Sequence, residues 1–315
     1  FQAEDGIRDF CLSRGLGDVY KRQGVVTTIS DEVRLAATFG NPDSTVYEYW
    51  FSAANFLAYS NNLKIVRAAN IATTRNAVAN TVAAAAVLIS NDDDWLSNYS
   101  GGGVTRGEFA ARYAGSYGNS LKVSLADANT YATWTYASQF STTPNTSTYV
   151  ANQGGANDEI HIIVVDEDGK FTGTQGTVLE KYGYVSKASD AKDDSGNTNF
   201  YKNVLANKSK YVHWLSHPTG NTAASYANAS STWGSAASNI SFTKLAANVT
   251  LSLASGADGT ISTANVVTAY DFFNNAEAVD VALIVSGPAD TTLSTSLISI
   301  AEARKDCVVF LSPPK

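Results

Sequence analysis

Apolar side chains recur every three to four residues along several segments of this chain, a spacing typical of helices that bury one face. The strongest patterns predict helices over residues 45–58, 263–274 and 290–304. Thr45 and Glu48 have the spacing of a capping box at the start of the first. Its expected inward face consists of Tyr47, Trp50, Phe51, Ala54, Leu57 and Ala58. Weaker patterns predict short helices over residues 30–39, 105–113 and 200–207.

Shorter apolar runs between these helices predict strands. They cover residues 25–29, 63–68, 121–125, 159–165, 177–185, 210–215, 279–285 and 307–311. The last two are almost entirely apolar and enclose a helix with Asp290 as its expected N-cap. We therefore expect a parallel pair of strands buried on both faces. Strands and helices also alternate before residue 69, which predicts another strand-helix-strand unit.

The two ends of the chain therefore show an α/β pattern, whereas the middle is rich in predicted strands. The simplest architecture is an α/β core domain, with βαβ units and a mixed or parallel sheet, interrupted by an inserted α+β, β-rich domain. We expect the first part of the core at residues 24–69, the inserted domain at 70–255 and the second, truncated part of the core at 256–315.

Residues 1–23 are interpreted as a translated sequencing adapter, a disordered artefact outside the fold. Gln2–Asp9 fits the codons CAA GCA GAA GAC GGC ATA CGA GAT, a common flow-cell adapter. Asp18–Gln23 fits GAT GTG TAT AAG AGA CAG, the transposase recognition end of the same kits. Both lie in one frame and in the right order. Because the chain also has no Met, we expect it to be an internal fragment of a longer protein.

The composition excludes some classes of function. The net charge of −7 argues against a nucleic-acid binder, because phosphate contacts need clustered Lys and Arg. The longest apolar stretch, Val78–Ile89, contains Asn80 and Thr81 and is too short to cross a bilayer. With 44% hydrophobic and 16% charged residues, the chain has enough apolar side chains for an ordinary core.

The candidates for metal binding or nucleophilic chemistry are few. His213 and His217 have the i, i+4 spacing of a metal pair, but Pro218 and a strand-like run argue against a helix there. His161 begins an apolar run, so all three histidines are interpreted as structural. Cys307 begins a predicted buried strand, which favours an inert packed thiol.

Three acidic clusters could in principle bind calcium: Asp92–Asp94, Asp166–Asp168 and Asp193–Asp194. Lys170 stands where a calcium loop would need a third acidic ligand. We therefore interpret all three as ordinary solvated turns. The sequence predicts no catalytic residue, no metal site and no cofactor, and it indicates a structural protein rather than an enzyme.

Two blocks of sequence resemble the tail sheath proteins of T-even-like contractile-tailed phages. The first comprises Ala37–Pro42, Tyr49–Tyr59 and Leu63–Ala68, and the second Ala269–Phe273, Val279–Val281, Ile298–Cys307 and Ser312–Pro314. Leu179–Tyr182 and Val185–Ala188 are similar to an inserted domain of some relatives. The core of this family has been described as subtilisin-like in fold, but no protease residues carry over to this sequence.

The resemblance implies that the protein is a virion component, assembled in the host cytoplasm. Its partners would be other sheath subunits, the tail tube protein, the baseplate and the tail terminator. The sheath surrounds the tube and contracts to drive it through the host envelope for genome delivery, with neither nucleic-acid binding nor membrane insertion by the sheath itself. In this family, terminal arms add strands to neighbouring subunits. We place those arms outside residues 24–315 and predict that this fragment cannot polymerise.

Two alternatives stay open. One is the sheath of a bacterial contractile injection system or of a phage-tail-like bacteriocin, which neighbouring genes would distinguish. The other is a surface adhesin or receptor-binding module, suggested by the Thr-, Asn- and Ser-rich middle of the chain.

Overall fold

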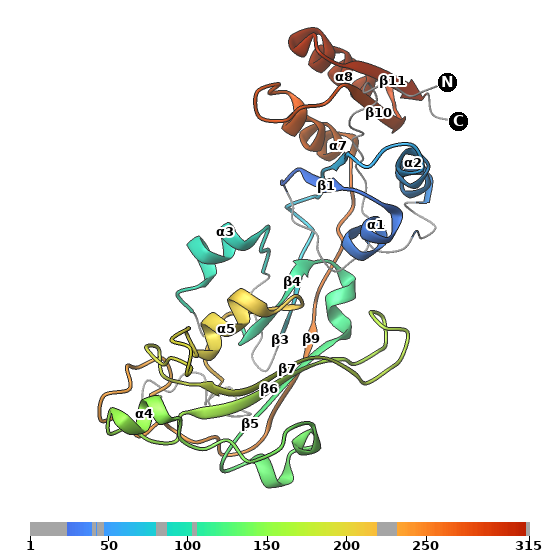
Figure 1. Cartoon of the computed structure of the whole chain (residues 1–315). Coiled ribbons are helices and arrows are strands. Elements are labelled where there is room, and N and C mark those ends of the chain that lie inside the picture. The colour runs from blue at the N-terminus through green and yellow to red at the C-terminus, as the bar shows by residue number, and fades with distance from the viewer. Residues whose placement is uncertain are drawn as a thin grey trace. The chain divides into compact units, whose positions relative to one another are not determined.

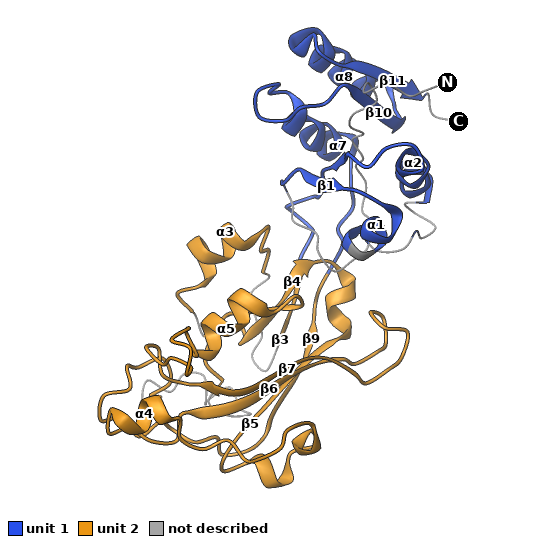
Figure 2. Ribbon diagram, viewed as in Figure 1, with its two compact units in different colours: residues 1–75, 257–315 blue, residues 76–256 orange. Residues whose placement is uncertain are grey.

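The computed structural model describes residues 24–39, 42, 47–79, 87–102, 106–218 and 232–312. These residues form a mixed α/β structure with a large antiparallel sheet (Figure 1). The chain divides into two compact units, shown in Figure 2: unit 1 falls within residues 1–75 and 257–315, and unit 2 is residues 76–256. Compactness alone does not show that either unit folds independently, so the domain assignment stays a prediction. The adapter interpretation of residues 1–23 and the capping box at Thr45 lie outside the described residues.

Unit 2 is built on a seven-stranded antiparallel sheet with the strand order β7-β6-β5-β9-β3-β4-β8. Its strands are β3 (Asn76–Ala79), β4 (Phe109–Ala114), β5 (Leu121–Asp127), β6 (Glu159–Asp166), β7 (Thr177–Ser186), β8 (Val212–Trp214) and β9 (Val249–Ala254). The chain enters the unit through β3 and leaves it through β9. These two strands are neighbours in the sheet, with Val78 opposite Ala254.

The main apolar core of unit 2 packs against this sheet. Among the described residues, the helices of unit 2 are α3 (Asp92–Asp94), a π-helix (Trp95–Tyr99), α4 (Thr148–Asn152) and α5 (Tyr201–Lys208), and short 3-10 turns cover Ser116–Ser120, Tyr131–Thr133 and Ala137–Gln139. Tyr201 and Leu205 of α5 and Trp95 of the π-helix pack with Ile162 and Val164 of β6 in one apolar cluster. Burying such side chains stabilises the fold by roughly 1.5–3 kcal/mol each.

Strand β6 is buried on both faces, because successive side chains of a strand point in opposite directions. Ile162 and Val164 join the main core, whereas Ile163 and Val165 join a second cluster with Trp134. In β9, by contrast, buried and exposed residues alternate along the whole strand. The second cluster therefore covers the sheet around β6 and leaves one face of β9 to solvent.

The described residues of unit 1 form two smaller sheets, each of two strands. Its elements are β1 (Thr27–Ile29), α1 (Glu32–Phe39), α2 (Tyr47–Leu57), β2 (Leu63–Ile65), α7 (Thr263–Tyr270), a 3-10 turn (Asp271–Phe273), β10 (Leu283–Pro288), α8 (Thr291–Arg304) and β11 (Val308–Ser312). One apolar cluster holds β1, α1, α2 and β2 together, and the other packs α7 and α8 against β10.

The predicted parallel pair near the C-terminal end is confirmed. Strands β10 and β11 are parallel and are joined through α8. Asp290 caps α8, because its carboxylate accepts the Leu293 backbone N–H at 2.9 Å. Leu293, Leu297 and Ile300 lie on the buried face of the helix.

Burial of β11 was predicted incorrectly. The side chains of Val308 and Phe310 are 59% and 58% exposed. Val309 points to the cluster around α8, so Val308 and Phe310 lie on the opposite face of the strand. Among the described residues β11 pairs with β10 alone, and nothing covers that second face.

Other predictions also need correction. Strands β1 and β2 pair in antiparallel fashion, so the N-terminal part is not a parallel βαβ unit. The helix predicted over 105–113 is instead β4, where pairing with β3 and β8 overrides the helical preference of an Ala-rich segment. Strands β3 and β9 were not predicted.

The buried face of α2 differs from the predicted one. Tyr49, Trp50 and Ala53 are buried, whereas Tyr47 and Phe51 are about half exposed. A helix that is apolar on almost every side shows a three-to-four spacing in more than one direction, so its period does not identify the inward face. Among the described residues, no helix is both long and apolar enough to cross a membrane.

Candidate functional site

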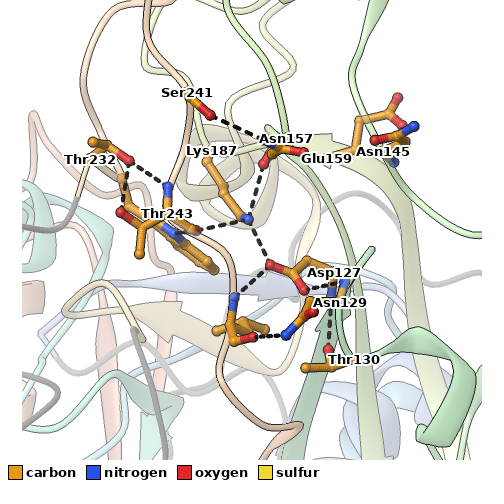
Figure 3. Close-up of polar contacts among 12 residues, drawn as sticks. Asp127, Asn129, Thr130, Asn145, Asn157, Glu159, Lys187, Thr232, Ser241 and Thr243 are labelled. Carbon is orange, nitrogen blue, oxygen red and sulfur yellow. Dashed lines mark hydrogen bonds and ion pairs between the residues drawn. The ribbon is translucent and has the colours of Figure 1, made fainter.

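A buried ion pair lies at the ends of β5 and β7 in unit 2 (Figure 3). Asp127 is the last residue of β5, and Lys187 follows β7 directly. The Lys187 Nζ and the Asp127 Oδ2 are 2.9 Å apart, and the two side chains are 0% and 2% exposed. The sheet register aligns the ends of these strands, so residues 60 positions apart meet inside the protein.

The surroundings of Lys187 match a charged ammonium group. Nζ donates three hydrogen bonds, to the Asp127 carboxylate and to the backbone oxygens of Asn157 and Thr243, the latter two at 3.1 Å each. The Trp233 ring lies 4.8 Å from Nζ and adds a cation–π contact. Burial lowers the pKa of Lys187, and Asp127 acts in the opposite direction. Three oxygen acceptors require three hydrogens, so the geometry identifies the protonated form.

Asp127 is equally well satisfied. Its Oδ2 also accepts the Leu245 backbone N–H at 2.7 Å, and its Oδ1 accepts the Asn129 backbone N–H at 3.0 Å. Two backbone donors and an ammonium group stabilise the carboxylate as an anion. The pair thus joins the segments around residues 127, 157, 187 and 243. With every polar atom occupied, it is suited to holding loops in place and not to chemistry on a substrate.

A second buried carboxylate, Asp158, lies beside this pair. It accepts hydrogen bonds from the backbone N–H and the hydroxyl of Ser147, both at 2.8 Å, and from the Ser186 hydroxyl at 2.5 Å. Ser147 is also the N-cap of α4. The same acidic side chain therefore positions the start of α4 and the end of β7.

The acidic cluster at residues 166–168 is not an ordinary solvated turn throughout, which corrects the prediction. Asp166 is fully buried. Its carboxylate accepts hydrogen bonds from the Ser120 hydroxyl, from the backbone N–H groups of Phe171 and Thr172, and from the Thr172 hydroxyl. These donors organise the turn after β6 and use both carboxylate oxygens.

The other two acidic clusters have local structural roles. The Asp94 Oδ2 accepts the Ser90 backbone N–H, and Asp92 pairs with Arg112 at 2.7 Å. Asp193 accepts the backbone N–H groups of Ser195 and Asn197 in a turn, and the Asn197 contact lowers its pKa. Among the described residues, no group of three or more His, Cys, Asp or Glu side chains is arranged to hold a metal ion.

The three histidines all lie in unit 2 and are mostly enclosed. His213 is in β8, stacked on Trp95, and burial lowers its pKa to about 3. The His217 Nδ1 lies 2.6 Å from the Tyr201 hydroxyl, and burial lowers the pKa of His217 to about 4. The structure does not combine these two in a helix, and His161 lies on a different strand, β6. Near β11, burial raises the pKa of the Cys307 thiol, which disfavours the reactive thiolate.

Sequence reasoning missed Lys187 and Asp127 as a functional pair. Lys187 was noted only within the stretch Val185–Ala188 that resembles an inserted domain. A lone Lys between small and apolar residues at the end of a strand is the signal that could have suggested burial. Its partners come from three distant segments and carry no common spacing.

Comparison with known proteins gives two curated relatives. The chain is 28% identical over 153 aligned positions to the tail sheath protein of Salmonella phage ViI, covering 49% of this chain and 22% of that protein. It is 22% identical over 383 aligned positions to the tail sheath protein of Enterobacteria phage T4, covering 92% of this chain and 56% of that protein. The chain thus spans about half of the T4 protein and less of the ViI protein. Both relatives are structural tail sheath proteins and not enzymes.

No family model matches the chain. Among solved structures, the sheath tail protein Lin1278 from Listeria innocua is similar with a TM-score of 0.47 and 11% identity. That match covers 96% of this chain and 45% of the Listeria chain.

Proposed function

We propose that this chain is part of a structural subunit of a contractile tail sheath from a T-even-like phage. The observation that carries the proposal is the match to the T4 tail sheath protein over 92% of the chain. The subunit would surround the tail tube and contract to drive the tube through the host envelope for genome delivery. Its partners would be further sheath subunits, the tube protein, the baseplate and the tail terminator.

The surface of unit 1 supports a role in assembly. Its exposed apolar side chains include Phe51 of α2, Ile298 of α8 and Phe310 of β11, each 47–58% exposed. Under this proposal, these side chains are available to contact other sheath subunits. In a sheath, contraction requires stored free energy in subunit contacts and no catalytic residue. The well-satisfied polar networks of unit 2 agree with a mechanical role.

Both curated relatives are phage proteins, which favours a phage tail over a bacterial injection device. The first experiment is to amplify the locus from its source and sequence through both ends. Neighbouring tail-tube, capsid and terminase genes are expected. A locus without any tail gene would contradict the proposal. The adapter interpretation of residues 1–23 predicts that these codons are absent from independent clones.

The assembly test uses the complete gene recovered from that locus. Co-expression with the neighbouring tube gene is expected to give sheathed tubes in negative-stain electron micrographs, with the tube protein alone giving bare tubes as the control. If the complete product stays monomeric with the tube protein, baseplate and terminator all present, it is not a sheath subunit. Residues 24–315 alone are expected to remain unpolymerised, as predicted from the sequence.

A further inference from the structure

His161 connects two parts of unit 2 that are far apart in the sequence. One is the β6–β7 strand pair, and the other is the segment 128–147, here called the aromatic loop. The ring of His161 is fully buried and stacks on Phe140 of the loop, with centroids 4.1 Å apart and planes 7° apart. The ring of Tyr184 is nearly perpendicular to the His161 ring, at 87°, with centroids 4.5 Å apart.

Both ring nitrogens have defined hydrogen-bond roles. Nδ1 lies 3.1 Å from the backbone nitrogen of Tyr184, which is a donor, so Nδ1 must be the acceptor. Nε2 lies 2.9 Å from the Thr142 backbone oxygen, an acceptor, so Nε2 must carry the hydrogen. This network assigns the neutral Nε2–H tautomer.

The contact with Tyr184 falls at an irregularity in the sheet. The register between β6 and β7 shifts between Ile160 and Ile162, and Tyr184 has a φ of +56°, which is uncommon for a residue with a side chain. Since the bulge takes the Tyr184 N–H out of the regular ladder, the imidazole supplies its acceptor. The Tyr184 hydroxyl in turn bonds to the Ser141 and Thr142 hydroxyls at 3.1 and 2.7 Å. The bulge and the loop therefore depend on the same ring.

The aromatic loop covers apolar residues of the sheet. Trp134 and Phe140 pack over Ile163 and Val165, and Trp134 also donates to the Ser124 hydroxyl at 2.8 Å. Release of the loop would expose these side chains. The loop is thus a cover for the second face of the sheet around β6.

We propose that His161 is a proton-sensitive anchor for the aromatic loop: protonation of its ring removes the acceptor for the Tyr184 N–H, frees the loop and uncovers the apolar face of β6. A protonated imidazole has hydrogens on both nitrogens. Its Nδ1–H would then face the Tyr184 N–H directly, two donors with no acceptor between them. Burial lowers the pKa of His161, as expected for a ring that the fold holds neutral.

The ionisable groups around the ring are few. The phenols of Tyr131 and Tyr184 face it from the loop and from β7, and Ala126 lies opposite it on β5. Two positions away on β6, the Glu159 carboxylate accepts the Asn145 backbone N–H at 2.8 Å, so it also contacts the loop. Burial raises the pKa of Glu159. A test of the proposal must therefore separate the effect of protonating His161 from that of protonating Glu159.

The experiment is hydrogen exchange of the full chain between pH 7.5 and pH 5, corrected for the intrinsic pH dependence of exchange. Peptides covering 131–147 and 180–186 are expected to lose protection by up to about tenfold per pH unit as the pH falls from about 6.5, the ordinary pKa of a released imidazole, toward the lowered pKa of His161 in the closed loop. Peptides from β3 and from unit 1 should change far less. In Glu159→Gln the loss should persist. In His161→Gln the two loop peptides should be less protected at pH 7.5, and their protection should fall with pH no more steeply than that of the β3 peptide.

Three outcomes would overturn the proposal: a loop that keeps its protection at pH 5, an unchanged pH dependence in His161→Gln, or equal loss in every peptide. Nitrogen-15 NMR of the wild-type imidazole provides a measurement that needs no variant. It should show the Nε2–H tautomer at pH 7.5 and a ring whose pKa lies below the ordinary 6.5. An Nδ1–H tautomer at pH 7.5, or a ring that protonates above pH 6.5 while the loop keeps its protection, would refute the assignment.

Discussion

Units 1 and 2 distribute their apolar and ionisable side chains in opposite ways. Among the described residues, the large apolar side chains left exposed lie in unit 1 except for Leu96; they are Val33, Tyr47, Phe51, Tyr59, Ile71, Phe272, Ile298, Val308, Phe310 and Leu311. Buried ionisable side chains are concentrated in unit 2: Glu108, Asp127, Asp158, His161, Asp166, Lys187 and His213, against Arg67 and Arg304 in unit 1.

Exposing an apolar side chain and burying an ionisable one both cost free energy. Unit 1 does the first, and unit 2 does the second. Unit 2 uses buried charges to fix loop segments, such as those that donate hydrogen bonds to Asp127 and Asp166. Unit 1 has two modest apolar clusters and leaves apolar surface to solvent. Unit 2 should therefore respond to charge changes, and unit 1 to changes in packing and contact surface.

The largest expected change in the free energy of unfolding comes from removing the buried ammonium group of Lys187 in unit 2. Lys187→Met leaves the Asp127 carboxylate buried without its counter-ion and should lower the free energy of unfolding by about 3–5 kcal/mol. Lys122→Met is the matched control, because Lys122 pairs with Glu167 at the partly exposed surface; it should cost at most about 1 kcal/mol. Urea denaturation measures both. Equal effects of the two substitutions would contradict a special role for the buried pair.

Acid should destabilise unit 2 before unit 1. The pKa of His217 falls to about 4 in the fold and that of His213 to about 3, below an ordinary value of 6.5. The unfolded chain then binds more protons than the folded one below pH 6.5, so stability is full above that pH and decreases as the pH falls. His217 alone should account for about 3 kcal/mol between pH 7 and 4. Urea denaturation of the wild type and of His217→Gln at pH 7 and pH 4 measures this contribution. Between the two pH values, the free energy of unfolding of the variant should fall by about 3 kcal/mol less than that of the wild type.

Packing in unit 1 can be tested at Gly287, where β10 approaches α2. This residue has a φ of +58°, and a Cβ there would lie 2.6 Å from the Tyr49 ring. Gly287→Ala should cost about 2 kcal/mol from backbone strain together with the clash. Gly173→Ala is the control, with a φ of +79° and open space around it; it should cost about 1 kcal/mol. Thermal unfolding gives both values, and a Gly287 effect no larger than the control would exclude the clash.

The smallest effect on stability is expected at the exposed face of β11. Phe310→Ser should change the free energy of unfolding by less than about 0.5 kcal/mol, because the ring is 58% exposed. It should nevertheless reduce self-association and binding of an apolar dye, measured by light scattering and fluorescence. Leu96→Ser in unit 2 is the matched control. A large loss of stability in Phe310→Ser would show that the ring is packed and not available for contact.

Features set by neighbouring residues could be predicted from the sequence. The cap at Asp290 depends on residues three or four positions away, and it is present. The run from 159 to 165 is a strand because its continuous apolar character fits burial on two faces. These predictions succeeded because each depends on side chains within one or two turns.

Features set by distant partners could not be predicted. Strand β4 contains Ala-rich sequence that favours a helix, and only its pairing with β3 and β8 makes it a strand. The exposure of Phe310 depends on which elements cover β11, which its own apolar sequence does not reveal. Lys187 finds Asp127 through the sheet register, across 60 positions. Buried charges are therefore the part of the candidate site that sequence reasoning missed.

The adjacency of β3 and β9 has a consequence for how the gene can change. The backbones of Arg75 and Ala257, just outside these strands, exchange hydrogen bonds of 2.8 and 3.0 Å. Two residues paired in this way lie about 5.5 Å apart at their Cα atoms, a gap that a two-residue turn can close. The segment 76–256 thus begins and ends next to two residues that are neighbours in space. Recombination at the codons for residues 75 and 257 could delete, exchange or acquire this segment in frame, and the strands outside it would keep their connectivity.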